Sequence, residues 1–367
     1  MDTRDRAGGP DASAGPELAV VVCTLGETPV AATVDSIAAS AQSAGRAVEI
    51  LVVWQGAGRP VVPEGVGVLE VFPRGSSYAR NRGLAAVETG LVGFLDDDET
   101  IAESWVAAAH VEAAALDGAF GPVLSTNPGD PPYFCPTGER VVYQGTGTPP
   151  WLVGTGGNMV FPRETLVRAG GFDPRFGAGA PVGSAEETEL FLRLLGGGQR
   201  LVYTPELTVY HPSRGLEDEV GARRAYGVGM GIALRGRSPL LSAKYLYTIA
   251  QELGRSVRRR NSRRRREVVT TLRSFLTGLV APVKADSPVA ALDRLPAELR
   301  GQLGGEEPRP LPGTVGARAH LRYALGGERV LHLRVNPAPG LVESLDSNAR
   351  IEARAAGTDA IWAIERG

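Results

Sequence analysis

The sequence predicts an α/β fold built on a mostly parallel sheet, and three features indicate it. Two continuous β-prone runs, at residues 18–24 and 49–54, flank an alanine-rich segment at residues 31–44 whose apolar residues have helical spacing. A strand, a helix and a second strand in this order predict a right-handed βαβ unit. The apolar run at residues 91–95 then stops at three consecutive aspartates, which is typical of a buried strand that leaves a parallel sheet.

Further helices and strands are expected along the next 120 residues. The segment 127–150 is rich in proline and glycine, and loops of that length inside a compact domain are usually functional. The expected elements are strands at 66–72, 120–124, 201–203 and 209–211, and helices ending near residue 88, at 103–116, from residue 163 to about 169, and at 187–195.

The composition fits a protein with a substantial core and no overall electrostatic attraction to nucleic acid or to a membrane. The chain has 367 residues, 43% of them hydrophobic, and a formal net charge of −2. Its two cysteines, Cys23 and Cys135, do not imply a disulfide framework. The first residues carry no secretory signal, and no apolar run approaches the roughly 20 residues that span a bilayer. We therefore expect a cytoplasmic protein.

We expect four parts along the chain: a flexible tail at 1–16, an α/β domain at 17–215, a helical extension at 216–284 and a C-terminal appendage at 285–367. The last part has a proline- and glycine-rich linker at about 301–316 and strand-like runs at 330–335 and 360–364, and its sequence indicates no function.

The helical extension carries a dense arginine cluster at residues 255–266 beside an amphipathic segment at 268–280. Such a combination can rest on anionic lipid at the inner face of a membrane. The alternative is a solvated basic face whose apolar side belongs to the protein core. No nucleic-acid-binding motif accompanies the arginines, so we do not expect a nucleic-acid partner.

The acidic strand end is the most informative chemical feature. Asp96 and Asp98 are two residues apart and leave the strand end in the same direction, so they repel one another unless a positive charge intervenes. Hard divalent cations bind carboxylate oxygens together with substrate phosphates. A metal and a nucleotide at these aspartates are therefore one interpretation, and a solvated acidic turn is the other.

The order of motifs in the first half resembles the family 2 inverting glycosyltransferases. A strand ending in Thr24, a second strand, the ARNRG segment at 79–83 and then FLDDDE follow in the family's order. The resemblance implies the Rossmann-like GT-A fold and a D-x-D pair that binds a divalent metal, Mn²⁺ or Mg²⁺, on a nucleotide-diphospho-sugar. It places the metal at Asp98 and His211, and the donor at Thr24, Leu25, Glu27, Gln55, Arg80, Asp96 and Asp97.

The second half resembles the acceptor half of the same family. GGN at residues 156–158, a helix that ends in GGFD, a carboxylate pair opening a helix, and a strand before a histidine all appear in the family's order. The resemblance covers about residues 17–215 and places the hydroxyl acceptor (a sugar, a lipid-linked sugar or a small molecule) near Trp151, Gly156, Gly157 and Asn158. The family usually has Glu-Asp at the carboxylate pair, where this chain has Glu186-Glu187.

The resemblance implies that Glu187 is the catalytic base, and chemistry also requires a base. Inverting transfer is a direct displacement, so the acceptor hydroxyl must lose its proton as it attacks. Glu186 is the rival base, and a favourable first-turn charge is the purely structural alternative for Glu187. His211 is either a ligand of the metal or diphosphate or an ordinary histidine. Arg80 either binds phosphate or forms an ion pair that holds its segment to the sheet.

One departure from the family affects the donor base. The family often has an aspartate at the end of the second strand that hydrogen-bonds uracil, whereas this chain has Trp54-Gln55. Gln55 offers a donor and an acceptor but no charge, so a guanine or thymine donor stays open beside uracil. Trp54 lies in an apolar run, which favours a place in the core over stacking on a ring.

The leading hypothesis is thus a metal-dependent inverting glycosyltransferase. A sugar nucleotidyltransferase on a similar sheet is the enzyme alternative, although it would be expected to carry a glycine-rich basic loop after the first strand, and residues 25–28 contain no basic residue. A non-catalytic carbohydrate-binding or scaffold protein with a retained fold is the third reading. The set of Asp96, Asp98, Glu187 and His211 argues against it.

Overall fold

The computed structural model describes residues 17–56, 61–71, 74–213 and 216–281, together with the backbone of five C-terminal strands. The predicted tail at 1–16 lies outside the described residues, as does the predicted linker at 301–316 except for residues 309–310.

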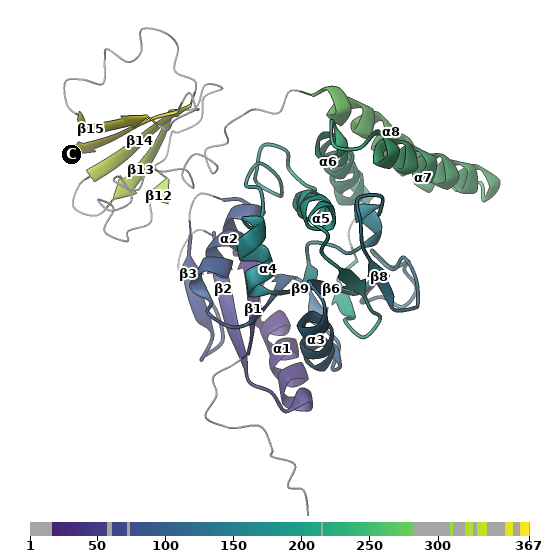
Figure 1. Ribbon diagram of the computed structural model, residues 1–367, viewed down its shortest axis with the longest axis horizontal. Coiled ribbons are helices and arrows are strands. Elements are labelled where there is room, and N and C mark those ends of the chain that lie inside the picture. Colours follow the sequence, from purple (N-terminus) through teal and green to yellow (C-terminus); the bar gives the residue numbers. More distant parts are fainter. Residues whose placement is uncertain are drawn as a thin grey trace, which may run out of the picture.

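A mixed sheet of eight strands, in the order β3-β2-β1-β4-β9-β6-β10-β8, forms the centre of the structure (Figure 1). The first four strands run parallel, β9 runs antiparallel to both β4 and β6, and β10 is parallel to β6. The predicted α/β class with a mostly parallel sheet is confirmed. The strands span Leu18–Thr24 (β1), Val48–Trp54 (β2), Gly67–Glu70 (β3), Leu91–Asp96 (β4), Gly118–Phe120 (β6), Val141–Tyr143 (β8), Asn158–Pro162 (β9) and Leu201–Tyr203 (β10).

Helices cover both faces of this sheet because successive side chains of each strand point to opposite faces. Ala19 and Val21 of β1 pack toward one helical layer, whereas Val20 and Val22 pack toward the other. The first layer is formed by α2 (Ser76–Ala86), α4 (Arg163–Ala169) and α5 (Glu186–Gly196), and the second by α1 (Ala31–Ala44) and α3 (Trp105–Ala115). Figure 1 shows α1 and α3 side by side under the sheet.

The single strand expected at residues 120–124 is wrong, because the chain breaks there into two strands of different sheets. β6 ends at Phe120, and β7 (Val123–Ser125) joins a three-stranded sheet with β5 (Thr100–Ile101) and β11 (Val209–His211). A Cβ at Gly121 would lie 2.0 Å from the carbonyl oxygen of Leu207, so only glycine fits at the break. Strand β8, inside the predicted loop at 127–150, was not expected from the sequence.

Three long helices follow β11: α6 (Leu216–Leu234), α7 (Pro239–Arg258) and α8 (Ser262–Val280). Helices α6 and α8 approach so closely that a Cβ at Gly278 would lie 2.2 Å from the carbonyl oxygen of Val228. Gly231 of α6 is part of the same contact, because a Cβ there would lie 2.4 Å from the carbonyl oxygen of Phe275. None of the described helices has the length and apolar character needed to cross a membrane.

The described C-terminal strands form an antiparallel sheet in the order β12-β13-β14-β16-β15. They span Arg309–Pro310 (β12), His320–Leu325 (β13), Arg329–Val335 (β14), Ala349–Arg354 (β15) and Ala360–Arg366 (β16). The two runs expected to be strands correspond to β14 and β16.

Candidate active site

The acidic segment lies at the carboxyl end of β4, next to the end of β1. Thr24 closes β1 and donates a hydrogen bond of 2.5 Å to Asp97, whose backbone carbonyl accepts a second one from Thr33 at 3.0 Å. Burial raises the pKa of Asp97 to about 6; the Thr24 hydrogen bond opposes this, and the neighbouring charges of Asp98 and Asp96 add to it. The structure therefore uses Thr24 and Asp97 to fix the acidic loop across two strand ends.

Arg80 joins the acidic segment to the carboxylate pair of α5. Its guanidinium lies 3.1 Å from Asp96 and 2.7 Å from Glu186, and the residue is only 3% exposed. Of the two readings of Arg80, this structure shows the ion pair, because both ends of the guanidinium fork bind carboxylates. A phosphate would have to compete with Asp96 and Glu186 for it, so direct donor binding by Arg80 receives no support.

Asp98 and His211 converge on one point and fit a divalent cation. His211 Nδ1 lies 2.5 Å from the carbonyl oxygen of Pro212, and His211 Nε2 lies 3.2 Å from Asp98 Oδ2. With Nδ1 directed at this carbonyl, Nε2 faces the carboxylate, and an imidazole nitrogen and a carboxylate oxygen are both common ligands of divalent cations. Adjacent ligands of an octahedral Mg²⁺ site at about 2.1 Å are about 3 Å apart, close to the observed separation.

Among the described residues, no group of three or more histidine, cysteine or acidic side chains could by itself hold a metal ion. A site with only Asp98 and His211 fits a cation that takes its remaining ligands from substrate phosphates and water, which is how Mg²⁺ is often bound.

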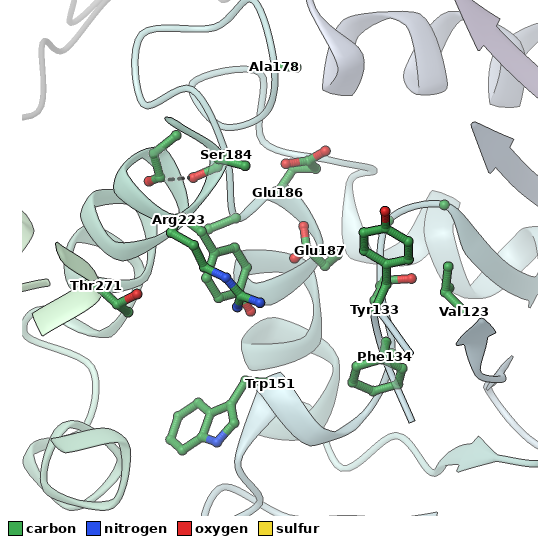
Figure 2. Close-up of a pocket in the computed structure, with 18 of the residues that line it drawn as sticks. Val123, Tyr133, Phe134, Trp151, Ala178, Ser184, Glu186, Glu187, Arg223 and Thr271 are labelled. Carbon is green, nitrogen blue, oxygen red and sulfur yellow. Dashed lines mark hydrogen bonds between the residues drawn. The ribbon is translucent and has the colours of Figure 1, made fainter. Parts of the chain in front are cut away.

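The two glutamates that open α5 have different surroundings. Glu186 accepts hydrogen bonds from Arg80 at 2.7 Å and from Ser76 at 3.1 Å. Burial, followed by the charge of Glu186, raises the pKa of Glu187 to about 8. Figure 2 shows the Glu187 carboxylate beside the cavity described below. Glu186 is thus held in an ion pair, whereas Glu187 has the shifted pKa expected of a general base.

The two glycines of the GGN motif allow close approach of charged side chains. A Cβ at Gly157 would lie 2.6 Å from the Glu99 carboxylate, and one at Gly156 would lie 3.2 Å from the Arg80 guanidinium. Glu99 itself is 2% exposed and accepts a hydrogen bond from the backbone N–H of Asp96, and burial raises its pKa well above the usual range. These glycines line the cavity, and their clearest role is to admit Glu99 and Arg80.

The assignment of Asn158 to acceptor binding is contradicted by its surroundings. The residue is fully buried, and its side-chain oxygen accepts a hydrogen bond from the indole N–H of Trp105 at 2.9 Å. Its side-chain nitrogen donates to the carbonyl oxygens of Pro122 and Leu207. An amide used in this way holds β9 to the neighbouring loops and has no accessible group for an acceptor.

The residues predicted near the donor base lie at the ends of β1 and β2. Gln55 is 3% exposed, and its side-chain oxygen is 3.3 Å from the backbone N–H of Gly75. Trp54 is buried, as expected, with Gly26 and Gly56 against its ring. The remaining two predicted donor contacts, Leu25 and Glu27, are exposed in the loop after β1.

A cavity of about 570 Å³ joins the acidic segment, the carboxylate pair and the helical extension. Trp151 lines it and meets Tyr245 of α7 edge to face, with ring centroids 4.9 Å apart. Figure 2 shows Arg223 between Trp151 and Glu187, and the hydrogen bond from Ser184 to the Ala225 carbonyl that ties α6 to this wall. The lining residues that sequence reasoning missed come mainly from the extension and the 127–150 loop: Tyr133, Phe134, Arg223, Tyr226, Tyr245, Glu252, Arg264 and Glu267.

These residues carry no motif of their own. The sequence features that stood out in the extension were the arginine cluster at 255–266 and the amphipathic segment at 268–280, and neither indicated a cavity wall. Tyr226 illustrates the omission, because burial and the charge of Glu187 raise its pKa well above the usual range.

No protein-family model matches the chain, and no curated protein matches it. Among solved structures, a mannosyltransferase from Pyrobaculum calidifontis in complex with GDP-Man and Mn²⁺ is 18% identical, with a TM-score of 0.47 over 79% of this chain and 82% of that chain. TarS 1–349 from S. aureus in complex with UDP-GlcNAc is 15% identical, with a TM-score of 0.45 over 84% and 97% of the two chains. Both likenesses concern the fold alone.

Proposed function

We propose that the protein is a metal-dependent inverting glycosyltransferase that moves a sugar from a nucleotide-diphospho-sugar to a hydroxyl acceptor. The observation that carries the proposal is the convergence in one cavity of a strand-end aspartate, a histidine and a buried glutamate of raised pKa. Asp96 at the end of β4, His211 and Glu187 line this cavity, and Asp98 lies 3.2 Å from His211.

In this proposal the residues divide between donor and acceptor. Asp98 and His211 hold the cation, which when bound neutralises charge on the leaving diphosphate. Asp96 lies beside them and contacts the ribose or the sugar, and Arg80 keeps Asp96 and Glu186 in fixed positions. Gln55, at the end of β2, lies near the donor base and allows more than one base.

Transfer is a single displacement. The acceptor oxygen bonds to the anomeric carbon, the bond from that carbon to the phosphate oxygen breaks, and the hydroxyl proton passes to Glu187. Trp151 and the aromatic residues of α6 and α7 form the wall of the cavity beyond Glu187, where the acceptor enters. Burial of Glu187 serves this step, because a base whose pKa lies near the working pH takes up a proton efficiently.

A sugar nucleotidyltransferase and a non-catalytic scaffold protein are the two alternatives, and each fits these residues less well. A nucleotidyltransferase would need basic side chains in the loop after β1, and residues 25–28 provide none. A scaffold protein would gain nothing from a buried glutamate with a raised pKa, which costs folding free energy at neutral pH.

A thermal-shift experiment tests the proposal without knowledge of the sugar. The full chain is melted with UDP, GDP or TDP, each with and without Mn²⁺. A ligand at 100 times its Kd stabilises the folded state by about 2.7 kcal/mol, which raises the Tm of a domain of this size by roughly 5–10 °C. We expect one nucleotide to act only together with Mn²⁺. No shift with any of the three would contradict the proposal.

A further inference from the structure

Helix α7 has an apolar stripe on the side that faces solvent. Along its length, Leu240, Tyr247 and Val257 are 59%, 65% and 53% exposed. Ala243 and Ala250 are exposed between them, and the spacing of these five residues places them on one side of a helix. The stripe runs about 26 Å at 1.5 Å per residue, from Leu240 to Val257, and Arg258 follows it. Lys244 lies at its edge and donates a hydrogen bond to the Gly147 carbonyl.

The opposite face of the same helix already has its partners. Leu241, Tyr245 and Ile249 are buried in the core of the three-helix extension, and Tyr245 and Ile249 also line the cavity. A surface helix normally turns its polar side to water. The apolar stripe is therefore not explained by packing within the described part of the chain.

The arginine cluster begins where the stripe ends. Residues 255–266, at the turn from α7 to α8, contain eight arginines and no acidic residue. Three of the eight pair with carboxylates of the same two helices: Arg255 with Glu252, Arg263 with Glu267, and Arg264 with both. The other five are exposed, and no carboxylate of the described chain forms an ion pair with them: Arg258, Arg259, Arg260, Arg265 and Arg266.

We propose that the α7 stripe and the arginine cluster form one surface that binds an anionic lipid bilayer. Apolar side chains on one side of a helix, an exposed tyrosine and adjacent arginines are the features of helices that lie in a membrane interface. A polyanion such as nucleic acid would account for the arginines but not for Leu240 and Tyr247. A protein partner would not require a cluster in which all the charges are positive.

This surface lies on the back of the cavity wall, because α7 contributes Tyr245, Thr248 and Glu252 to the cavity. Helices α7 and α8 lie side by side, as Figure 1 shows, so both ends of their connecting turn would contact the same bilayer. Membrane binding by this surface does not depend on the proposed transferase activity, and either proposal can fail without the other.

Co-sedimentation with vesicles tests the proposal. The full chain is mixed with vesicles of phosphatidylglycerol and phosphatidylcholine, or of phosphatidylcholine alone, at low and at physiological salt. We expect binding only to the anionic vesicles, weakened by salt. The triple variant Arg258→Gln/Arg259→Gln/Arg260→Gln should lose affinity on the order of 100-fold, since each arginine near such a surface contributes roughly fivefold.

A matched control removes three exposed arginines elsewhere, with Arg46→Gln/Arg168→Gln/Arg200→Gln, and should bind as the wild type does. The double variant Leu240→Gln/Tyr247→Gln tests the stripe and should also bind more weakly. The proposal is overturned if anionic vesicles are not bound, if phosphatidylcholine is bound equally well, or if the control loses as much affinity as the cluster variant. Unchanged binding by the double variant, or tighter binding of duplex DNA than of vesicles, would overturn it as well.

Discussion

The raised pKa of Glu187 predicts both a pH profile and its loss in Glu187→Gln. With a pKa of about 8, Glu187 is about 1% ionised at pH 6, about 10% at pH 7 and half ionised at pH 8. If the ionised form takes the acceptor proton, kcat/KM for the donor rises about tenfold per pH unit to pH 8 and then levels off, because this parameter reports ionisations of the free enzyme.

Glu187→Gln keeps the size of the side chain and removes the proton acceptor. Removal of a general base typically costs about 10²–10⁴-fold in rate. We expect a fall of this size in kcat, no rise in rate between pH 6 and 8, and donor binding close to that of the wild type. The assay is release of the nucleoside diphosphate from whichever sugar nucleotide the thermal-shift experiment identifies, with water or an added sugar as acceptor.

The choice of control follows from the structure. Glu186→Gln is unsuitable because Glu186 binds the buried Arg80 at 2.7 Å, so that variant disturbs an ion pair as well as a charge. Glu164→Gln on α4 makes the same change at a side chain that is 74% exposed, where it removes a surface ion pair with Arg168, and this variant should keep full activity. A wild-type profile that is flat from pH 6 to 9, or a rise with pH that persists in Glu187→Gln, would refute the assignment of the base.

The same pKa makes a prediction about stability that needs no substrate. The folded-state pKa of about 8 lies above the ordinary value of 4.5, so between these values the folded protein keeps a proton that the unfolded chain has lost. This contribution to stability is fully present below pH 4.5 and is lost as the pH rises through 8. Glu187→Gln has no such proton, so its Tm should exceed that of the wild type by a margin that grows from pH 5 to 9. A constant margin would contradict the raised pKa.

Three further changes test the metal site, the buried ion pair and the helix packing. Asp98→Asn should abolish Mn²⁺-dependent binding of the nucleoside diphosphate in calorimetry while leaving the circular dichroism spectrum unchanged; wild-type binding would exclude Asp98 as a ligand. Arg80→Met removes the partner of two carboxylates at a residue 3% exposed and should cost about 3–5 kcal/mol in urea unfolding, so a loss below 1 kcal/mol would contradict the network. Gly278→Ala places a Cβ 2.2 Å from the Val228 carbonyl and should destabilise by about 1–3 kcal/mol. Gly221→Ala, with no atom within 4 Å, should instead stabilise α6 by up to about 1 kcal/mol, and similar effects of the two changes would contradict the close contact.

The sequence alone predicted the α/β class, the first βαβ unit, the strand β4 and the polar residues at the ends of these strands; it did not predict the central strand β9. Buried parallel strands read as continuous apolar runs, so β1, β2 and β4 were found near their observed limits. The aspartates after β4 and the glutamates opening α5 could be predicted as candidates from the sequence, because adjacent carboxylates next to a buried segment repel one another unless a positive charge or a ligand lies between them. The same rule missed β8 and joined β6 to β7, since pairing partners far along the chain decide whether three residues form a strand.

Only the tertiary structure decided how the candidates divide their roles. Glu186 and Glu187 are adjacent and identical, and the sequence favoured Glu187 only through a resemblance. Arg80, 106 residues before Glu186, pairs with it and leaves Glu187 as the carboxylate with the raised pKa. The sequence placed Asn158 in an acceptor-binding loop, whereas in the structure its side-chain amide binds Trp105 and two backbone carbonyls.

The sequence could not predict the cavity wall or the α7 stripe, and the physical reason is the same for both. Periodicity shows that a helix has two sides, but both sides of α7 carry apolar residues, with Tyr245 on one and Tyr247 on the other. Which side is buried depends on α6 and α8, whose contact with α7 is a property of the folded chain. The pKa of Glu187 is likewise set by burial among segments that are far apart in the sequence, which no local pattern records.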